Sequence, residues 1–567
     1  MLYMDVKIPI CGILGVLMLL WIPASRLQAQ VQVAPDRYLI EFTDKNHNRY
    51  TTGFPQYFLS ERALQRRARQ GIAVGYADLP VSSYYIDSLK RMGFDVLHRS
   101  RWFNSATVRC LPEDIEKLHH IDFIKHAPEN KKTESVQDSI FEKDDDLETL
   151  FSFLFREKEN TGSQYAAPTA YYGQAADQIG MMNGHFLHNS GFRGKGMLIA
   201  VIDGGFYKTG ELSGFDKIRN SGQLMGIKCF SDDGNSALGE NNHGANVLSI
   251  IASDLPGRMI GSAPDAEYML LRSEEVGKEY LVEEENWIAA VEYADSIGSD
   301  LITSSLGYSV FDDVSQNHHY PDLDGRTVRA SRAAAMAAAR GMIVCVSAGN
   351  DGDSHWKHVS VPADADSVVT IGAVDGAGRY ASFSSTGHTA DGRIKPDLVA
   401  MGKETAYQNT MGNINTGNGT SYSTPLLAGL IACLWQAHPD KSNMDIIGMV
   451  KRSASHFQKP DSLYGYGIPD FSKLVDSTRS DDPYTVSIIP NPDTGTLTLY
   501  LSPATHGYIH IRINTLSGQP LFLHSGYVSG YTVYELTVDE SKHFTAGMYL
   551  VEVRTDAGKI TEKAVKQ

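Results

Sequence analysis

Cysteine is scarce in this chain. The 567 residues contain five cysteines, which are far apart and form no Cys-x-x-Cys pair: Cys11, Cys110, Cys229, Cys345 and Cys433. Such spacing argues against a disulfide scaffold and against a cysteine-ligated zinc site. Cys345 and Cys433 lie inside apolar runs, so we expect buried free thiols. A disulfide among Cys229, Cys345 and Cys433 is the alternative.

Several catalytic signatures are also missing. The chain contains no His-Glu-x-x-His segment, which disfavours a metal-dependent hydrolase. In the stretch GTSYSTP, residues 419–425, Ser423 stands where a Gly-x-Ser-x-Gly elbow around Ser421 would have its second glycine. Thr424 stands where Ser-x-x-Lys would have its lysine. Both the α/β-hydrolase and the Ser-x-x-Lys mechanisms are therefore excluded for Ser421.

Basic residues are outnumbered. The chain has 51 Lys and Arg against 67 Asp and Glu, a formal net charge of −16. Such a chain is a poor candidate for binding nucleic acid or an anionic membrane. One basic cluster lies in a short helical stretch, and we expect it to form a solvated helix face: Arg62, Arg66, Arg67 and Arg69.

The longest apolar run is at the N-terminus, and no other run is long enough to cross a bilayer. Lys7 precedes an uncharged apolar run over residues 8–22, which is followed by the small and polar segment PASRLQAQ. This arrangement predicts a secretory signal peptide over residues 1–30, cleaved near Ala29 or Gln30. The run is shorter than the roughly 20 residues that a membrane span needs. We therefore expect an exported protein with no transmembrane segment in its mature form.

The remaining chain divides into segments of different pattern. Residues 31–130 alternate strand, helix, strand, strand, helix and strand, which predicts a small α+β unit. Residues 131–171 are rich in charged and small polar residues and predict an exposed linker with a processing region. Residues 485–567 show period-two alternation with Ser-Gly and Ala-Gly turns, which predicts a β-sandwich.

Residues 172–478 predict an α/β domain. The short apolar runs MLIAVI, YMLL, LITSSL, MIVCVS and VVTIG suit strands that are buried on both faces. Helical stretches such as ENWIAAVEYADSIGSD and RTVRASRAAAMAAARG separate several of them. Alternating strands and helices indicate a parallel sheet covered by helices on both faces, in three layers.

Four polar residues follow these runs or open helices. Asp203 follows MLIAVI, His243 begins a helical pattern, Asn350 follows MIVCVS, and Ser421 lies in GTSYSTP. The carboxyl ends of parallel strands gather reactive groups at one edge of a sheet. A serine hydroxyl needs a base such as His243, and the imidazolium needs an anion such as Asp203. Asn350 and the Ser421 backbone N–H would then stabilise the oxyanion.

Each of these residues also has an ordinary structural interpretation. Asp203 could cap a strand, His243 could be a surface histidine, and Asn350 could be a turn residue. Ser421 could be a helix N-cap, since serine is favoured there and Pro425 is tolerated in a first turn. Their joint occurrence, in the order Asp, His, Asn and Ser, favours catalysis.

The segments IAVIDGG, NNHGANV, SAGNDGD and GTSYSTP resemble the four signatures of the subtilisin-like serine proteases, in that family's order. The resemblance covers about residues 172–475 and implies a serine endopeptidase that cleaves peptide or protein substrates. It assigns Asp203, His243 and Ser421 to catalysis and Asn350 to the oxyanion hole. It also implies that five further residues bind the substrate: Ser305, Leu306, Gly307, Ala348 and Gly349.

The flanking segments carry resemblances of their own. Residues 31–130 resemble the propeptides of such proteases, which assist folding and inhibit the enzyme. From residue 485, IIPNP, LSGQPL, GMYLVEV and KAVKQ resemble the sorting domains exported by the type IX secretion machinery of Bacteroidetes. This implies an extracellular or surface-attached protein. A β-sandwich adhesion module is the alternative for the tail, and an inactive surface-binding protein is the alternative for the whole chain.

The chemistry expected here requires no cofactor. A structural calcium ion is compatible with the resemblance, but the sequence does not place it. Asp322 and Asp324 in DLDGR suggest a calcium turn, and we prefer to interpret this segment as a surface loop.

Overall fold

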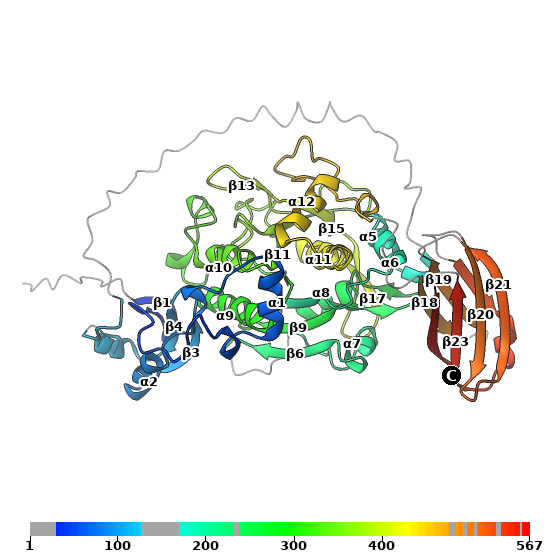
Figure 1. The fold of residues 1–567 in the computed structure, drawn as a ribbon. Coiled ribbons are helices and arrows are strands. Elements are labelled where there is room, and N and C mark those ends of the chain that lie inside the picture. The colour runs from blue at the N-terminus through cyan, green and yellow to red at the C-terminus, as the bar shows by residue number, and fades with distance from the viewer. Residues whose placement is uncertain are drawn as a thin grey trace, which may run out of the picture.

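The computed structural model arranges the chain as three parts in sequence order (Figure 1). We call them the N-terminal unit, the central domain and the C-terminal domain. The expected signal peptide and most of the expected linker lie outside the described residues. Those residues are 30–118 and 120–125 in the N-terminal unit, 169–231, 238–239 and 241–475 in the central domain, and 484–490, 496–503, 507–528, 534–555 and 558–566 in the C-terminal domain.

The N-terminal unit is a four-stranded antiparallel sheet with two helices. The strand order is β1-β2-β4-β3. The elements are β1 (Gln30–Ala34), β2 (Arg37–Glu41), α1 (Glu61–Arg69), α2 (Ser83–Arg91), β3 (Asp95–Ser100) and β4 (Ser105–Arg109). Where the sequence predicts a last strand, the described residues 120–125 form a single bridge, which joins Ile124 to Phe42. The α+β prediction is otherwise confirmed.

The central domain is built on a seven-stranded parallel sheet, as predicted. Its order is β15-β12-β11-β10-β5-β9-β6, and every neighbouring pair is parallel. Its strands are β5 (Leu198–Asp203), β6 (Leu224–Cys229), β9 (Glu267–Arg272), β10 (Leu301–Ser304), β11 (Ile343–Ser347), β12 (Val369–Val374) and β15 (Leu398–Met401). The sequence patterns did not single out the two edge strands, β6 and β15.

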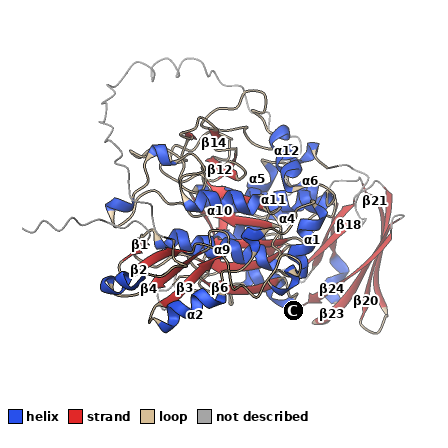
Figure 2. Ribbon diagram, turned by 60° about the vertical axis from the view of Figure 1, so that its left-hand side comes forward, coloured by secondary structure: helices blue, strands red, loops and turns tan. Residues whose placement is uncertain are grey.

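Helices cover both faces of this sheet (Figure 2). Along β5, Ile199 and Val201 belong to one apolar core, whereas Ala200 and Ile202 belong to the other. Side chains alternate between the faces of a strand, so each strand contributes to two cores. The first core includes α8 (His243–Ala252), α11 (Thr420–Ala437) and α12 (Asn443–Ser453), and the second includes α9 (Val282–Ile297) and α10 (Arg329–Ala338).

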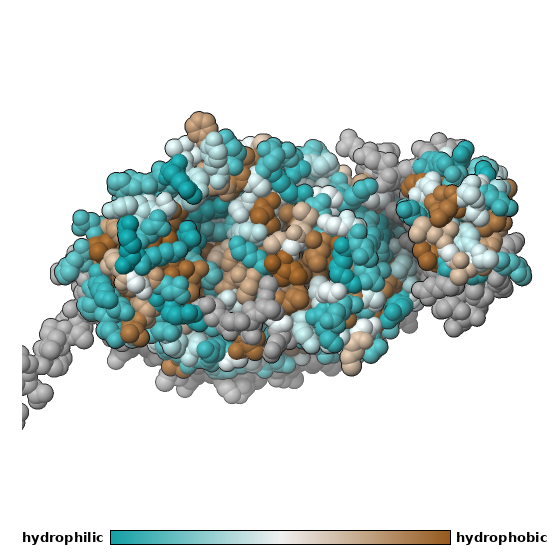
Figure 3. Space-filling view, turned by 90° about the horizontal axis from the view of Figure 1, so that it is seen from below, coloured by the Kyte–Doolittle hydropathy of each residue, from teal (hydrophilic) through white to brown (hydrophobic). Residues whose placement is uncertain are grey.

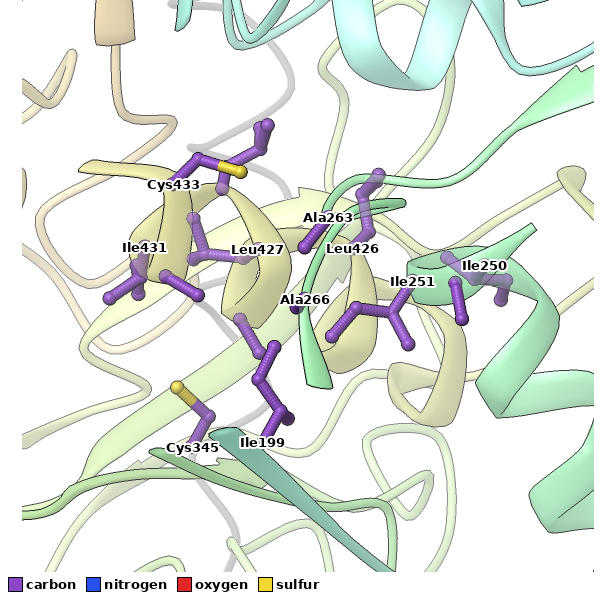
Figure 4. Close-up of a cluster of buried hydrophobic side chains, with 14 of the residues drawn as sticks. Ile199, Ile250, Ile251, Ala263, Ala266, Cys345, Leu426, Leu427, Ile431 and Cys433 are labelled. Atoms are coloured by element: carbon purple, nitrogen blue, oxygen red, sulfur yellow. The ribbon is translucent and has the colours of Figure 1, made fainter. Parts of the chain in front are cut away.

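The cysteines of the central domain are unbridged. Cys345 on β11 and Cys433 on α11 are both fully buried and free, and Cys229 is free as well. Figure 4 shows the sulfur atoms of Cys345 and Cys433 well separated within the first core. The expectation of buried free thiols is therefore confirmed for Cys345 and Cys433. The alternative, a disulfide among Cys229, Cys345 and Cys433, is not confirmed.

The N-terminal unit packs against α9 through ion pairs. Arg66 and Arg67 on α1 are 0% and 1% exposed, and both guanidinium groups bind Asp295 of α9. The expectation of a solvated helix face is therefore wrong for these two residues. The sequence pattern could not indicate their partner, because Asp295 lies more than 200 residues further along the chain.

The C-terminal domain consists of two antiparallel sheets that share one core, which confirms the predicted sandwich. Its strands are β18 (Tyr484–Pro490), β19 (Leu497–Pro503) and β22 (Tyr534–Val538) in one sheet, and β20 (Gly507–Thr515), β21 (Pro520–Val528), β23 (Gly547–Thr555) and β24 (Gly558–Lys566) in the other. On the face of the molecule shown in Figure 3, brown hydrophobic residues are interspersed with hydrophilic ones. No helix among the described residues combines the length and the apolarity needed to cross a membrane.

Candidate active site

A cleft lies at the carboxyl ends of the central strands. The chain extends the sheet in one direction from β5 to β9 and β6, and in the other from β10 to β15. Ligands of open α/β sheets bind at such a reversal of strand order. Asp203, His243, Asn350 and Ser421 all line this cleft, although more than 200 residues separate the first from the last.

Asp203 and His243 form a hydrogen-bonded pair. Asp203 is the last residue of β5 and is fully buried, and its Oδ1 lies 2.8 Å from His243 Nδ1. His243 is the first residue of α8, and its backbone N–H donates to Asn241 Oδ1. Burial lowers the pKa of His243, but the charge and hydrogen bond of Asp203 outweigh it and leave the pKa raised. The pair therefore favours a protonated imidazole.

Ser421 lies in the first turn of α11 and does not cap it. The N-cap is Gly419, whose φ of 154° favours glycine. Pro425 has no N–H to donate to the carbonyl four residues earlier, which is that of Ser421. That carbonyl instead accepts a 2.9 Å hydrogen bond from Ser305 Oγ, and Ser421 Oγ lies 3.4 Å from Ser305 O. The N-cap alternative for Ser421 is thus excluded.

The amide of Asn350 has a fixed orientation. Its Oδ1 accepts hydrogen bonds from the backbone N–H of Thr420 at 2.8 Å and from Thr420 Oγ1 at 3.0 Å. The Nδ2 end of the amide is thereby directed away from Thr420. The preceding Gly349 has a φ of 107°, and a Cβ there would approach Ser360 Oγ to 2.7 Å. Glycine is therefore required at this position of the loop.

The structure brings most of the expected substrate-contact residues to the cleft. Ser305, Leu306, Gly307 and Gly349 line it. Ala348 does not, because it is fully buried and its side chain packs into the second core. Its backbone N–H donates to Ile371 O, which keeps it within the sheet.

An acidic wall of the cleft was missed by the sequence analysis. It is formed by four carboxylates: Glu274, Glu275, Glu279 and Asp312. Glu274 and Glu275 could have been found in the same way as Asp203, since they come just after a buried strand, one residue beyond the end of β9 (Glu267–Arg272). Burial raises the pKa of Glu274 to about 8 and that of Glu279 to about 7.

Family comparisons match each part of the chain. The subtilase family (Peptidase S8) matches residues 194–467. The peptidase S8 propeptide domain of Bacteroidota matches residues 37–144, and the secretion system C-terminal sorting domain matches residues 487–567. A sorting domain of this kind indicates export, to the cell surface or the medium.

Curated relatives include a serine protease, a subtilisin and a further protease. The chain is 26% identical over 306 residues to serine protease AprX of Bacillus subtilis (strain 168). This alignment covers 48% of this chain and 65% of AprX. It is 26% identical over 324 residues to subtilisin E of the same organism, covering 56% of this chain and 74% of subtilisin E. M-protease of Shouchella clausii (strain KSM-K16) is 25% identical over 445 residues, which are 78% of this chain and 93% of that protein.

A solved structure has the same fold. The crystal structure of the epidermin leader peptide processing serine protease EpiP from Staphylococcus aureus aligns with a TM-score of 0.51 and 17% identity. The alignment covers 79% of this chain and 99% of that one. The chain therefore carries a serine protease domain of the subtilase family, which follows a Bacteroidota S8 propeptide domain and precedes a C-terminal sorting domain.

Proposed function

We propose that the protein is a secreted serine endopeptidase that cleaves peptide bonds with the triad Asp203, His243 and Ser421. One observation carries this proposal: the 2.8 Å pair of His243 and Asp203 opens onto the same cleft as Ser421. The function of the family matched by residues 194–467 supports it.

In the proposed first step, the hydroxyl of Ser421 exchanges its weak contact with Ser305 O for a hydrogen bond to His243 Nε2. Its oxygen attacks the substrate carbonyl while His243 takes the proton. Asp203 holds Nδ1–H and stabilises the imidazolium. His243 then gives the proton to the leaving amine, and an acyl-enzyme on Ser421 results. Water releases the acid by the reverse sequence, so the chemistry requires no cofactor.

The oxyanion would be held by Asn350 Nδ2 and the Ser421 backbone N–H. The first N–H groups of a helix have no partner within the helix. In α11 the N–H of Thr420 already donates to Asn350 Oδ1, so the next N–H, that of Ser421, is the donor we propose for the oxyanion. Removing one such donor costs roughly 100- to 1,000-fold in turnover, a magnitude that comes from this family rather than from the present geometry.

The substrate would bind as an added strand. Ser305 to Gly307 and Gly349 lie at the edges of the cleft, where extended backbone can pair with backbone. Ala348, being fully buried, supports this wall from below. The N-terminal unit would act as inhibitor and folding aid until it is removed, and the type IX machinery would recognise the C-terminal domain.

A fluorophosphonate probe tests the proposal. We expect the processed protein to be labelled, the Ser421→Ala variant to lose all labelling, and the Ser423→Ala variant to keep it. Ser423 is the matched control, since it is two residues away and its hydroxyl binds Thr420 O. Equal labelling of the native and Ser421→Ala proteins would contradict the proposal. Absence of any labelling would favour the inactive surface-binding alternative.

A further inference from the structure

Three carboxylates converge beside the cleft, at the junction of β9 and α9. Glu274 and Glu279 lie in the connecting loop, and Glu283 lies in the first turn of α9. Each offers one oxygen, and the three oxygens lie within 4.8 Å of one another. Glu274 and Glu279 also line the cleft, so the cluster is accessible from it.

Glu283 has an unsatisfied oxygen. Its side chain is buried, with the whole residue 1% exposed. Oε1 accepts a 2.7 Å hydrogen bond from the backbone N–H of Glu275. Within the described part of the chain Oε2 has no hydrogen-bond partner and no contact with solvent. A buried carboxylate oxygen without a partner is costly, so a ligand that could satisfy it has to be sought.

The surrounding side chains do not neutralise the cluster. Arg37 of the N-terminal unit reaches this region, but its guanidinium pairs with Glu275 at 2.8 Å. Lys278 is exposed and, among the described residues, forms no ion pair. The hydroxyl of Tyr308 donates to Glu274 Oε1 at 2.7 Å and lies 3.4 Å from the backbone oxygen of Glu283, so it brings no positive charge to the carboxylates. Asp312 adds a further negative charge to the same wall.

We propose that Glu274, Glu279 and Glu283 bind a divalent metal cation of the calcium type. Carboxylate oxygens alone, without histidine or cysteine, are the ligands of hard cations rather than of zinc. Calcium accepts six to eight oxygens, so water from the open cleft completes its coordination. A cation bound there would satisfy the buried carboxylate of Glu283.

The other acidic segment that suggested calcium is already satisfied. Asp324 Oδ1 accepts from the backbone N–H groups of Arg326 and Thr327, and Asp324 Oδ2 accepts from Thr327 Oγ1. Its carboxylate therefore caps the local turn. The interpretation of DLDGR as a surface loop stays a prediction.

A cation in this position ties the cleft wall to α9. Glu274 lies against Gly204, the residue after Asp203, since a Cβ at Gly204 would lie 3.5 Å from Glu274 Cγ. Binding would hold the loop over residues 274–279 against the first turn of α9. The ion would thus stabilise one wall of the substrate cleft without taking part in the chemistry.

Terbium luminescence tests the site in the full chain carrying Ser421→Ala, which cannot cleave itself by the proposed mechanism. Tyr308 touches Glu274, so excitation of tyrosine should sensitise Tb³⁺ bound at the cluster. We expect saturable emission that Ca²⁺ displaces. Adding Glu279→Gln or Glu283→Gln should weaken binding at least tenfold. The matched control Glu211→Gln, an exposed glutamate outside the cluster, should change it less than twofold.

Thermal unfolding gives the second readout. Ca²⁺ should raise the Tm of the parent and of the Glu211→Gln control, but not that of Glu279→Gln. Glu279 is only partly buried, so this variant is expected to fold even if Glu283→Gln does not. The proposal is overturned if Tb³⁺ and Ca²⁺ do not bind, which would be expected if the ammonium group of Lys278 neutralises the carboxylates. It is also overturned if the Glu279→Gln variant binds these ions as tightly as the parent. Neither readout requires turnover, so failure here is distinguishable from failure of the proposed protease function.

Discussion

Removing the carboxylate of Asp295 should release the N-terminal unit from the peptidase domain. Asp295 is fully buried on α9 and binds three arginines of the N-terminal unit: Arg66, Arg67 and Arg101. Arg67 contacts it at 2.8 and 3.0 Å. The Asp295→Ala variant would leave these guanidinium groups buried against α9 without their shared anion.

The size of the effect follows from burial. Arg66 and Asp295 have side chains that are 0% exposed, so solvent does not screen the interaction. Breaking a buried ion pair by removing one partner costs about 3–5 kcal/mol. At about 1.4 kcal/mol per tenfold, the N-terminal unit should bind roughly 100- to 4,000-fold more weakly.

The assay measures dissociation of the N-terminal unit. The Ser421→Ala chain is cut between residues 126 and 168 with an added protease, and release of the N-terminal fragment is followed at equilibrium. The matched control is Glu267→Gln, whose partner Arg62 lies 3.3 Å away with both side chains about one-third exposed. This pair should contribute about 0–1 kcal/mol, or less than about sixfold. A change below tenfold for Asp295→Ala, or equal to the control, would refute the reasoning.

Three further predictions concern the cleft and the core. Thr420→Val removes one of the two hydrogen bonds that orient Asn350, and this bond is worth about 1 kcal/mol. The kcat should therefore fall about fivefold with KM unchanged, and a change confined to KM would contradict this role of Thr420. His243 must be neutral to accept a proton, and its pKa is raised above the ordinary value of 6.5. The acid limb of the pH profile of kcat/KM should therefore lie above pH 6.5, with activity lost as the pH falls through it. An acid limb below pH 6 would contradict the role of Asp203. The buried thiol of Cys433 is free; a reductant should leave the Tm unchanged, and a drop of several degrees would indicate a disulfide.

The sequence predicted the central fold because its strands are buried on both faces. Such strands are continuous apolar runs, and β5 and β11 were recognised on that basis. The edge strand β6 (Leu224–Cys229) is only partly buried and has a mixed pattern, so it was missed. In the N-terminal unit, the strand expected near Ile124 forms one bridge within the described residues 120–125, since the alternation and β-propensity of a segment do not specify its pairing partner.

Local sequence determined which residue types stand at the ends of the strands. Asp203 and Asn350 could be identified as candidates because a polar residue after a buried apolar run has a defined place in a parallel sheet, whereas Ser421 was identified from the segment GTSYSTP at the start of a helix. The glycines beside them, Gly349 and Gly419, are required by positive φ angles that only a tight turn demands.

Only the tertiary structure decided which side chains meet. The contacts of Ser305 with Ser421 and of Asp295 with Arg66 join residues with no shared local pattern. The same holds for the approach of the carboxylates of Glu274 and Glu283 to within 4.8 Å. Charge in the sequence does not tell whether a residue is solvated or buried, because a buried charge depends on a partner supplied by a distant segment. Packing of the N-terminal unit on α9 therefore turned an apparently exposed basic helix into a buried interface.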